Sequence, residues 1–362
     1  MPKKLNFGES DSLNRHRLTV DEVDLIKNYR IQASLLEAEC EQAGIDKTTI
    51  KHYWYKSKVF SIFAKPNQKS LLDLKNQLMK DMDKHSPKYP TIKRKPLKDS
   101  HCLVIDPCDI HIGKLGSELE TGEKYNTSIA IKRVHEGVDG LLRKSQGFNL
   151  DKIVLIIGND ILHTDNTKRT TTSGTPQDTD GMWYDNFLLA RRLYVDIIEK
   201  LTAVADVHVI HNPSNHDFMA GWYLAESLQN WFRVSKNITF DIDMKHRKYF
   251  LYHDNLIGST HGDGAKDSDL PQLMSIECKH WSMAKHRYIY THHVHHKNAK
   301  DRIGVTIESS RSASGSDGWH DRNGYKGVPK AIEAYLHHPK QGQIARFTHI
   351  FNIISIIFLV LW

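Results

Sequence analysis

The chain has 362 residues, of which 39% are hydrophobic and 26% charged, with a formal net charge of +7 at pH 7. This composition is typical of a globular protein and argues against wholesale disorder, and the length is sufficient for two domains. The N-terminal segment lacks the apolar stretch of a signal peptide, and the four cysteines show no paired spacing. We therefore expect a reduced, cytoplasmic protein without a cysteine-based zinc site.

The positive charge is concentrated near the N-terminus. The first hundred residues contain 20 of the 50 Lys and Arg residues but only 13 of the 43 Asp and Glu residues. Residues 47–100 alone carry 14 basic and 4 acidic side chains, whereas residues 101–362 are neutral overall. A basic segment beside a neutral domain favours binding to a polyanion such as DNA.

Residues 1–63 are expected to form a small helical domain, with helices over residues 19–57. Gly44 is a candidate C-cap, and a second, basic helix is predicted to begin at Asp46 or Lys47. This pattern resembles a helix-turn-helix unit, although a plain helical hairpin that docks on the main domain is the alternative. The lysines that the second helix would present to DNA are Lys47, Lys51, Lys56 and Lys58.

Residues 64–100 are predicted to be a basic linker with one helix, because prolines and clustered charges interrupt regular structure. From residue 101 to 349, strand and helix patterns alternate, which predicts an α/β domain with helices outside the sheets. The apolar residues 350–362 are too few to span a membrane and are expected to form a terminal strand or tail. The predicted strands are 102–106, 153–157, 207–210, 238–242, 256–260, 287–291 and 303–308, and the predicted helices are 128–144, 186–204 and 222–233.

Metal-binding residue types follow several of the predicted strands. In open α/β sheets, ligands bind at the carboxyl ends of the strands, so polar residues there are candidates for a site. One D-x-H pair often arises by chance. Five strand ends in order that carry only oxygen and imidazole donors rarely arise by chance. The candidates are Asp109, His111, Asp160, Asn215, His216, His261, His293 and His295.

In this order, these residues resemble the five motifs of the calcineurin-like metallophosphoesterase superfamily: D-x-H, G-D, G-N-H-D/E, a lone His, and G-H-x-H. The resemblance covers residues 101–335 and implies a four-layer αββα sandwich, here preceded by the small helical domain. The stretches 166–181 and 314–327 further resemble phage-encoded members related to DNA repair exonucleases, for which the cytoplasm would be that of the host cell.

The resemblance also implies two divalent metal ions, with Mn²⁺ expected first and Fe, Zn²⁺ or Mg²⁺ as alternatives. Asp160 would be shared between the two ions, and His216 would donate a proton or a hydrogen bond to the leaving oxygen. The other ligands of the first metal would be Asp109, His111 and His295. Those of the second would be Asn215, His261 and His293.

Three departures from the motifs stand out. The second motif reads Gly-Asn-Asp, so Asp165 is the alternative to Asp160 as the shared ligand. Ser214 and His292 stand where glycine is usual, so either their backbones are strained or the turns differ.

Five further histidines near the motifs are expected to support the ligands or lie on the surface: His163, His211, His253, His292 and His296.

The expected function is hydrolysis of phosphodiester bonds, in DNA, as an exonuclease or endonuclease. The alternatives are a phosphomonoesterase or protein phosphatase, and a DNA-binding regulator whose phosphoesterase fold is catalytically idle. The polar insert 166–181 is expected to be a mobile loop that contacts substrate through Lys168 and Arg169, with a disordered surface excursion as the alternative. No membrane association is expected.

Overall fold

The computed structural model describes residues 53–56, 61–64, 88–324 and 327–351, and the chain divides into two compact units after Ser86. In the first unit, β1 (Tyr53–Lys56) and β2 (Ser61–Ala64) form an antiparallel hairpin. The prediction of a helix through residue 57 is therefore wrong over β1. The run Tyr-Trp-Tyr favours a strand, because aromatic residues pack well on a pleated surface. The rest of the predicted helix-turn-helix unit, with Lys47, Lys51 and Lys58, lies outside the described residues.

The second unit contains two β-sheets. The six-stranded sheet has the order β13-β12-β3-β4-β5-β6 and is parallel from β3 to β6. Its strands are β3 (Ser100–Asp106), β4 (Asn149–Gly158), β5 (Asp206–Asn212), β6 (Ile238–Asp241), β12 (Ala331–His338) and β13 (Gly342–Ile350). The five-stranded sheet has the order β10-β11-β9-β8-β7. Its strands are β7 (Arg247–Tyr252), β8 (Asn255–Thr260), β9 (His286–Thr291), β10 (Asn298–Arg302) and β11 (Val305–Ser309).

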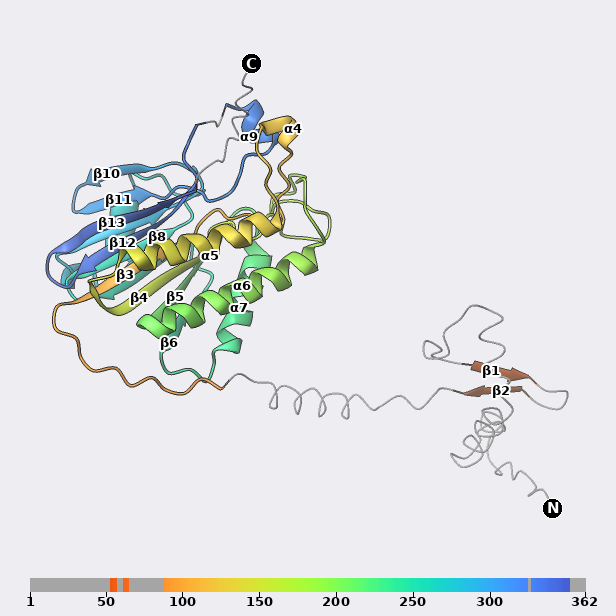
Figure 1. Ribbon diagram of the computed structural model, residues 1–362, viewed down its shortest axis with the longest axis horizontal. Coiled ribbons are helices and arrows are strands. Elements are labelled where there is room, and N and C mark those ends of the chain that lie inside the picture. Colours follow the sequence, from red (N-terminus) through yellow and green to blue (C-terminus); the bar gives the residue numbers. More distant parts are fainter. Residues whose placement is uncertain (1–52, 57–60, 65–87, 325–326, 352–362) are drawn as a thin grey trace, which may run out of the picture. The chain divides into compact units, whose positions relative to one another are not determined.

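Helices cover the outer faces of both sheets. α5 (Thr127–Lys144), α6 (Trp183–Val204) and α7 (Phe218–Trp231) pack on the six-stranded sheet, where α5 and α6 run side by side (Figure 1). α8 (Leu270–Glu277) and the 3₁₀ turn η2 (Trp281–Met283) pack on the five-stranded sheet. A third cluster of apolar side chains fills the space between the sheets. These layers confirm the predicted four-layer α/β sandwich. The short helices α4 (Glu118–Thr121) and α9 (Gly318–Arg322) complete the set described.

Local sequence explains the central elements. β4 contains the run IVLII, buried on both faces as expected for a central parallel strand. In α5, Ala130, Val134, Val138 and Leu141 recur every three or four positions and form its buried side. Asn126 caps this helix, because its side chain accepts a hydrogen bond from the backbone N–H of Ile129 at 3.0 Å.

Part of the predicted linker packs on the second unit. The hydroxyl of Tyr89 donates to Glu199 at 2.6 Å, the backbone N–H of Ile92 donates to Asn237 at 2.8 Å, and Arg94 pairs with Asp206. These interactions fasten the chain to α6 and to the amino end of β5 before β3 begins. Among the described residues, no helix is both long enough and apolar enough to cross a membrane.

Two buried histidines make the stability of this unit sensitive to acid. Burial, with a smaller contribution from Lys248, lowers the pKa of His211 to about 3. Burial, with a smaller contribution from His286, lowers the pKa of His337 to about 3. Both side chains are therefore neutral in the folded protein, whereas an unfolded histidine has a pKa of about 6.5.

We expect the free energy of unfolding to fall as the pH drops below about 6.5, because the unfolded chain then binds protons that the folded chain excludes. Each group contributes up to about 1.4 kcal/mol per pH unit until its folded pKa is reached. Urea unfolding at pH 7, 6 and 5 measures this slope. His337→Gln should make the slope shallower, and the exposed control His246→Gln should leave it unchanged. Parallel slopes for all three proteins would contradict this account.

Candidate metal centre

The candidate residues found in the sequence lie at one edge of the two sheets, where the carboxyl ends of five strands converge. The loop after β3 lies beside the loop after β4, and two backbone hydrogen bonds join them. The N–H of Asp109 donates to the carbonyl of Asn159 at 2.7 Å. The N–H of His111 donates to the carbonyl of Asp160 at 2.9 Å. The residues follow β3, β4, β5, β8 and β9 and are Asp109, His111, Asp160, Asn215, His216, His261, His293 and His295.

Six of these side chains form two groups, and in each group the potential ligand atoms lie within 4.8 Å of one another. In the first group, Nε2 of His295 is 3.3 Å from Oδ1 of Asp109. In the second, Nε2 of His261 is 3.3 Å from Oδ2 of Asp160 and 2.8 Å from Oδ1 of Asn215, which adds a seventh candidate. The first group is Asp109, His111 and His295, and the second is Asp160, His261 and His293.

These groups fit metal ions because they hold buried polar atoms that lack protein partners. In the described part of the chain, neither oxygen of Asp109 accepts a hydrogen bond, and Nε2 of His111 and Nδ1 of His261 have no partner. Unpaired buried polar groups are costly, so such atoms point to a ligand. Carboxylate, imidazole and amide donors together suit Mn²⁺, Fe or Zn²⁺.

The protonation states agree with metal binding. Burial would raise the pKa of Asp109, but the neighbouring His295 and His261 lower it below its usual range, so the carboxylate is charged. Burial and the nearby His216 hold the pKa of His111 well below its ordinary value. A neutral imidazole and an ionised carboxylate are the forms that bind metals.

Most of the candidate ligands have an unusual backbone. Five of the seven adopt the left-handed conformation, with φ between 48° and 70°. This conformation costs about 1–2 kcal/mol for a residue other than glycine, and such strain is concentrated at functional sites. The five are Asp109, His111, Asp160, His293 and His295.

Ser214 and His292, which replace the usual glycines, do not have a positive φ, so the turns differ from the glycine-based form and these two backbones are not strained. Ser214 instead uses its side chain: its hydroxyl accepts from the N–H of Asp160 at 2.9 Å and donates to Asp217 at 2.5 Å. His292 bonds Asp106 through Nε2 at 2.8 Å and the carbonyl of Thr260 through Nδ1 at 2.9 Å. Both residues therefore support the ligand loops.

Asp165, the alternative shared ligand, has a different environment. One of its oxygens accepts hydrogen bonds from the backbone N–H groups of Met219 and Ala220, each at 2.8 Å. The other accepts from the hydroxyl of Thr172 at 3.0 Å. Asp165 thus caps the start of α7, and it belongs to neither ligand group.

The insert 166–181 forms a wall of the site. Thr172 donates its backbone N–H to the carbonyl of Asn215 at 3.1 Å, and Asp180 donates to Gly113 at 2.8 Å. These bonds tie the insert to two of the candidate loops. Lys168 and Arg169 are exposed on it.

His216 lies beside the first group. Its backbone N–H donates to Oδ1 of Asp160 at 2.9 Å, and its Nδ1 lies 3.1 Å from the carbonyl of His163. Its ring centroid is 4.6 Å from that of His111. Because a carbonyl only accepts, Nδ1 carries the proton, and Nε2 is left for other partners.

The sequence predicts for His163 only a supporting or surface position, but the structure brings it into a third group with His111 and His216. Its Nδ1 is 3.3 Å from Nδ1 of His111. The sequence signal is its position three residues after Asp160. None of the other nearby histidines, His211, His253 and His296, belongs to a ligand group among the described residues.

A second set of residues was missed because the sequence offered no motif for it. Lys114 is buried, and its Nζ lies 2.9 Å from Asp317. The same carboxylate bonds Nδ1 of His320 at 2.7 Å, and the His320 ring stacks on His295 at 5.3 Å between centroids. Residues from the 314–327 stretch therefore flank the candidate centre.

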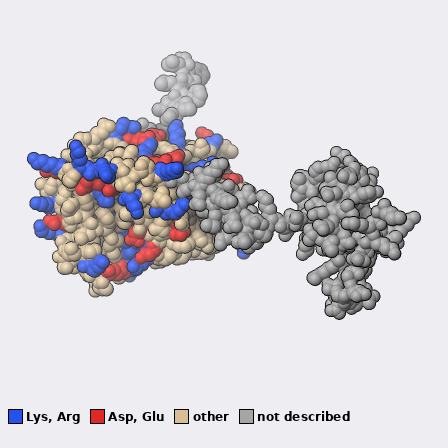
Figure 2. All heavy atoms as spheres, turned by 90° about the horizontal axis from the view of Figure 1, so that it is seen from below, with Lys and Arg blue, Asp and Glu red and all other residues tan. Residues whose placement is uncertain are grey.

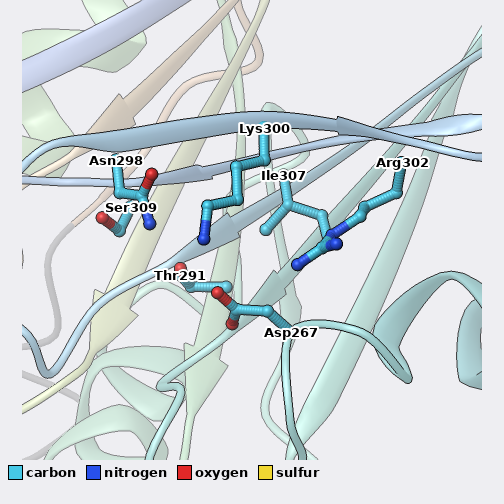
Figure 3. A pocket seen from close by; sticks show the side chains of 7 residues that line it. All are labelled: Asp267, Thr291, Asn298, Lys300, Arg302, Ile307 and Ser309. Atoms are coloured by element: carbon cyan, nitrogen blue, oxygen red, sulfur yellow. The ribbon is translucent and has the colours of Figure 1, made fainter.

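A small hollow lies further along the five-stranded sheet (Figure 3). Lys300 and Arg302 of β10 face Asp267 across it. Its volume of about 10 Å³ is close to that of a single water position, so it is too small for a substrate.

No family model matches the chain, and no curated protein matches it. Solved structures with a similar arrangement include an archaeal phosphodiesterase, at 8% identity and a TM-score of 0.32, over 69% of this chain and 99% of that one. Vps29 from Entamoeba histolytica, complexed with Zn²⁺, aligns at 12% identity and a TM-score of 0.27, over 69% of this chain and 99% of that one. A predicted phosphoesterase from Streptococcus pneumoniae aligns at 12% identity and a TM-score of 0.27, over 68% of this chain and 97% of that one. Likenesses at this level do not reveal what this chain binds, so its function has to be inferred from its own residues.

We expect Asp160→Asn to lose one or both metal ions, because it removes the carboxylate charge beside His261. Asp165→Asn is the matched control and should keep both, since it only weakens the cap of α7, at a cost of about 1 kcal/mol. Elemental analysis of each protein after loading with Mn²⁺ and desalting measures the difference. If Asp160→Asn kept two metals and full turnover, the shared ligand would have to be another residue.

Proposed function

We propose that this chain is a metal-dependent phosphoesterase of the calcineurin-like metallophosphoesterase superfamily and that it hydrolyses phosphodiester bonds. The observation that carries the proposal is the pair of adjacent ligand groups at the strand ends, with unpartnered buried carboxylate and imidazole atoms. A buried cluster of this kind has no evident structural purpose, because its polar atoms would stabilise the fold better if they were hydrogen-bonded.

In the proposed enzyme, Asp109, His111 and His295 would hold one ion, Asn215, His261 and His293 would hold the other, and Asp160 would serve both. Two divalent cations, when bound, neutralise charge on the phosphate and stabilise the attacking and leaving oxygens. The neutral state of His111 and the ionised state of Asp109 favour their role as ligands. The donor set accommodates Mn²⁺, which we propose as the native ion, as well as Fe, Zn²⁺ or Mg²⁺.

His216 is the proposed proton donor to the leaving oxygen. The backbone bond to Asp160 and the Nδ1 bond to the carbonyl of His163 fix both the position and the orientation of its ring. With Nδ1 donating to the carbonyl, Nε2 faces substrate and can donate a proton when the ring is protonated on both nitrogens. A general acid in this position contributes ~10²–10⁴ in rate.

We propose DNA as the substrate, which makes the enzyme a nuclease related to phage-encoded DNA repair exonucleases and acting in the cytoplasm. The support is the basic segment 47–100, since cationic side chains bind phosphates without regard to sequence. Residues 101–362 are neutral overall, and the face of the second unit in Figure 2 carries Lys and Arg intermixed with Asp and Glu. The basic segment, with Lys47, Lys51, Lys56 and Lys58, would therefore supply much of the affinity for long DNA.

Two other functions remain as alternatives. A phosphomonoesterase or protein phosphatase would use the same ligands, with the N-terminal segment serving assembly. A DNA-binding regulator with an idle site is disfavoured by the complete ligand set, because an idle site has no need of every ligand. Metal-dependent turnover separates the enzymes from the regulator, and salt-dependent DNA binding separates the nuclease from the phosphatase.

We expect His216→Ala to keep its metal content while turnover falls by ~10²-fold or more, because a proton donor is lost without a change in the ligands. The measurements are metal analysis and the turnover number with a chromogenic phosphodiester. A variant that lost metal instead would make His216 a structural residue.

We expect removal of residues 1–86 to leave hydrolysis of a small phosphodiester near normal, because the candidate ligands and the hydrogen bonds of Tyr89, Ile92 and Arg94 are retained. The same deletion should weaken binding to long DNA and flatten its salt dependence, since nine lysines between residues 47 and 84 are removed. Every phosphate that the protein no longer neutralises lowers the log–log salt slope by ~0.9 on duplex DNA. An unchanged affinity and slope would favour the phosphatase alternative.

A further inference from the structure

A second cavity, of about 540 Å³, lies beside the candidate metal centre. This volume is within the range of small-molecule sites. Its buried apolar residues are Ile112 and Leu162. Its exposed aromatic residues are Trp183 at the start of α6 and Tyr223 on α7, which are 47% and 52% exposed. The remaining lining residues are Thr164, Asp165, Asn166, Thr167, Asn186, Phe187, Met219 and Ala220.

The cavity lining includes residues from the loops that carry the candidate ligands. Ile112 follows the candidate ligand His111, and Thr164 follows His163, whose ring lies against His111. The backbone N–H of Leu162 donates to Asp217, the residue after His216, at 2.9 Å. Consecutive residues are about 3.8 Å apart, so the cavity begins within a residue or two of the site.

The carboxylate and the two amide side chains of the lining already bond to other parts of the protein. Asp165 caps α7 with one oxygen and bonds Thr172 with the other. Asn186 donates to the carbonyl of Asp180 at 2.9 Å and accepts from Thr127 at 3.2 Å. Asn166 donates to Thr170 at 2.7 Å and accepts from the N–H of Lys168 at 2.9 Å. The cavity therefore offers mainly apolar and aromatic surface.

We propose that this cavity binds a nucleobase of the substrate by stacking, without reading which base it is. The proposal rests on the proposed phosphoesterase function and narrows its substrates to nucleotide esters. Stacking on aromatic side chains tolerates every base, because each base has a π-face. With the carboxylate and amide groups turned to the protein, no fixed pattern of donors and acceptors selects one base over another.

The surroundings favour an aromatic group attached to an anion. Trp183, Phe187 and Tyr223 bring three aromatic rings from two helices to one cavity. Next to Trp183 in the chain is Met182, whose sulfur lies 3.5 Å from Nη2 of Arg169. A cation beside an aromatic cavity suits a base that carries a phosphate.

The kinetic test compares a thymidine dinucleotide with its abasic analogue, which has the same phosphodiester linkage but no bases. We expect wild-type protein loaded with Mn²⁺ to prefer the dinucleotide by about tenfold in kcat/KM, the order of one base–aromatic stack. Trp183→Ala and Tyr223→Ala should remove this preference and leave the abasic substrate within about twofold. Trp183→Phe should restore it.

Met219→Ala and Met283→Ala form a matched control pair. Both methionines are exposed, at 48% and 61%, but only Met219 lines the cavity. Only Met219→Ala should therefore reduce the preference. Equal rates of wild-type protein on the two substrates would overturn the cavity proposal while leaving the phosphoesterase function intact.

A binding measurement separates the two proposals. Calorimetric titration with thymidine 5′-monophosphate and with 2-deoxyribose 5-phosphate needs no turnover. We expect wild-type protein to bind the nucleotide about tenfold more tightly than the sugar phosphate, and Trp183→Ala to lose this difference. This result would support the cavity proposal even if no ester were hydrolysed. In that case only the proposed function would fail. Equal binding of both compounds by wild-type protein would overturn the cavity proposal.

Discussion

The buried contact between Asp106 and His292 holds the two sheets together beneath the candidate centre. Asp106 ends β3 in the six-stranded sheet, and His292 follows β9 in the other; both are almost fully buried. The hydroxyl of Ser310 also donates to Asp106, at 2.7 Å, and lies 2.9 Å from that of Tyr335. Removing one partner would leave the other as an unsatisfied buried polar group, which typically costs about 1–3 kcal/mol. The distance between the loop after β3, which carries Asp109 and His111, and the loop after β9, which carries His293 and His295, depends on this pair.

The left-handed ligand backbones depend on the same framework. A strained residue persists only where its surroundings over-determine it. Here the loop after β3 is bonded to the loop after β4, and Ser214 fixes the N–H of Asp160. Gly158 lets the end of β4 lie close to the end of β5, since a Cβ there would lie 2.2 Å from the carbonyl oxygen of Asn212. These bonds fix the backbone of the candidate ligand loops, and a preorganised site lowers the cost of binding.

Sequence reasoning located the seven predicted strands and the three long helices, because long apolar runs and regular periodicity are local signals. It missed β7, β10, β12 and β13. The pattern of β12 includes the buried charge of Glu333, which is neutralised by Arg311 and Arg346. It also placed β1 in a helix, because apolar residues four apart fit either structure. The candidate ligands were identified through short motifs at strand ends. The pairing of Asp106 with His292 could not be found, since 186 residues separate its partners.

The hollow of Figure 3 lies under β10, the last strand of the five-stranded sheet. Lys300, Asp301 and Arg302 on this strand are all exposed. Edge strands expose unpaired backbone groups that can recruit a strand from another molecule, and charged side chains oppose such pairing. The charges of β10 thus protect this edge of the sheet from aggregation between copies of the chain.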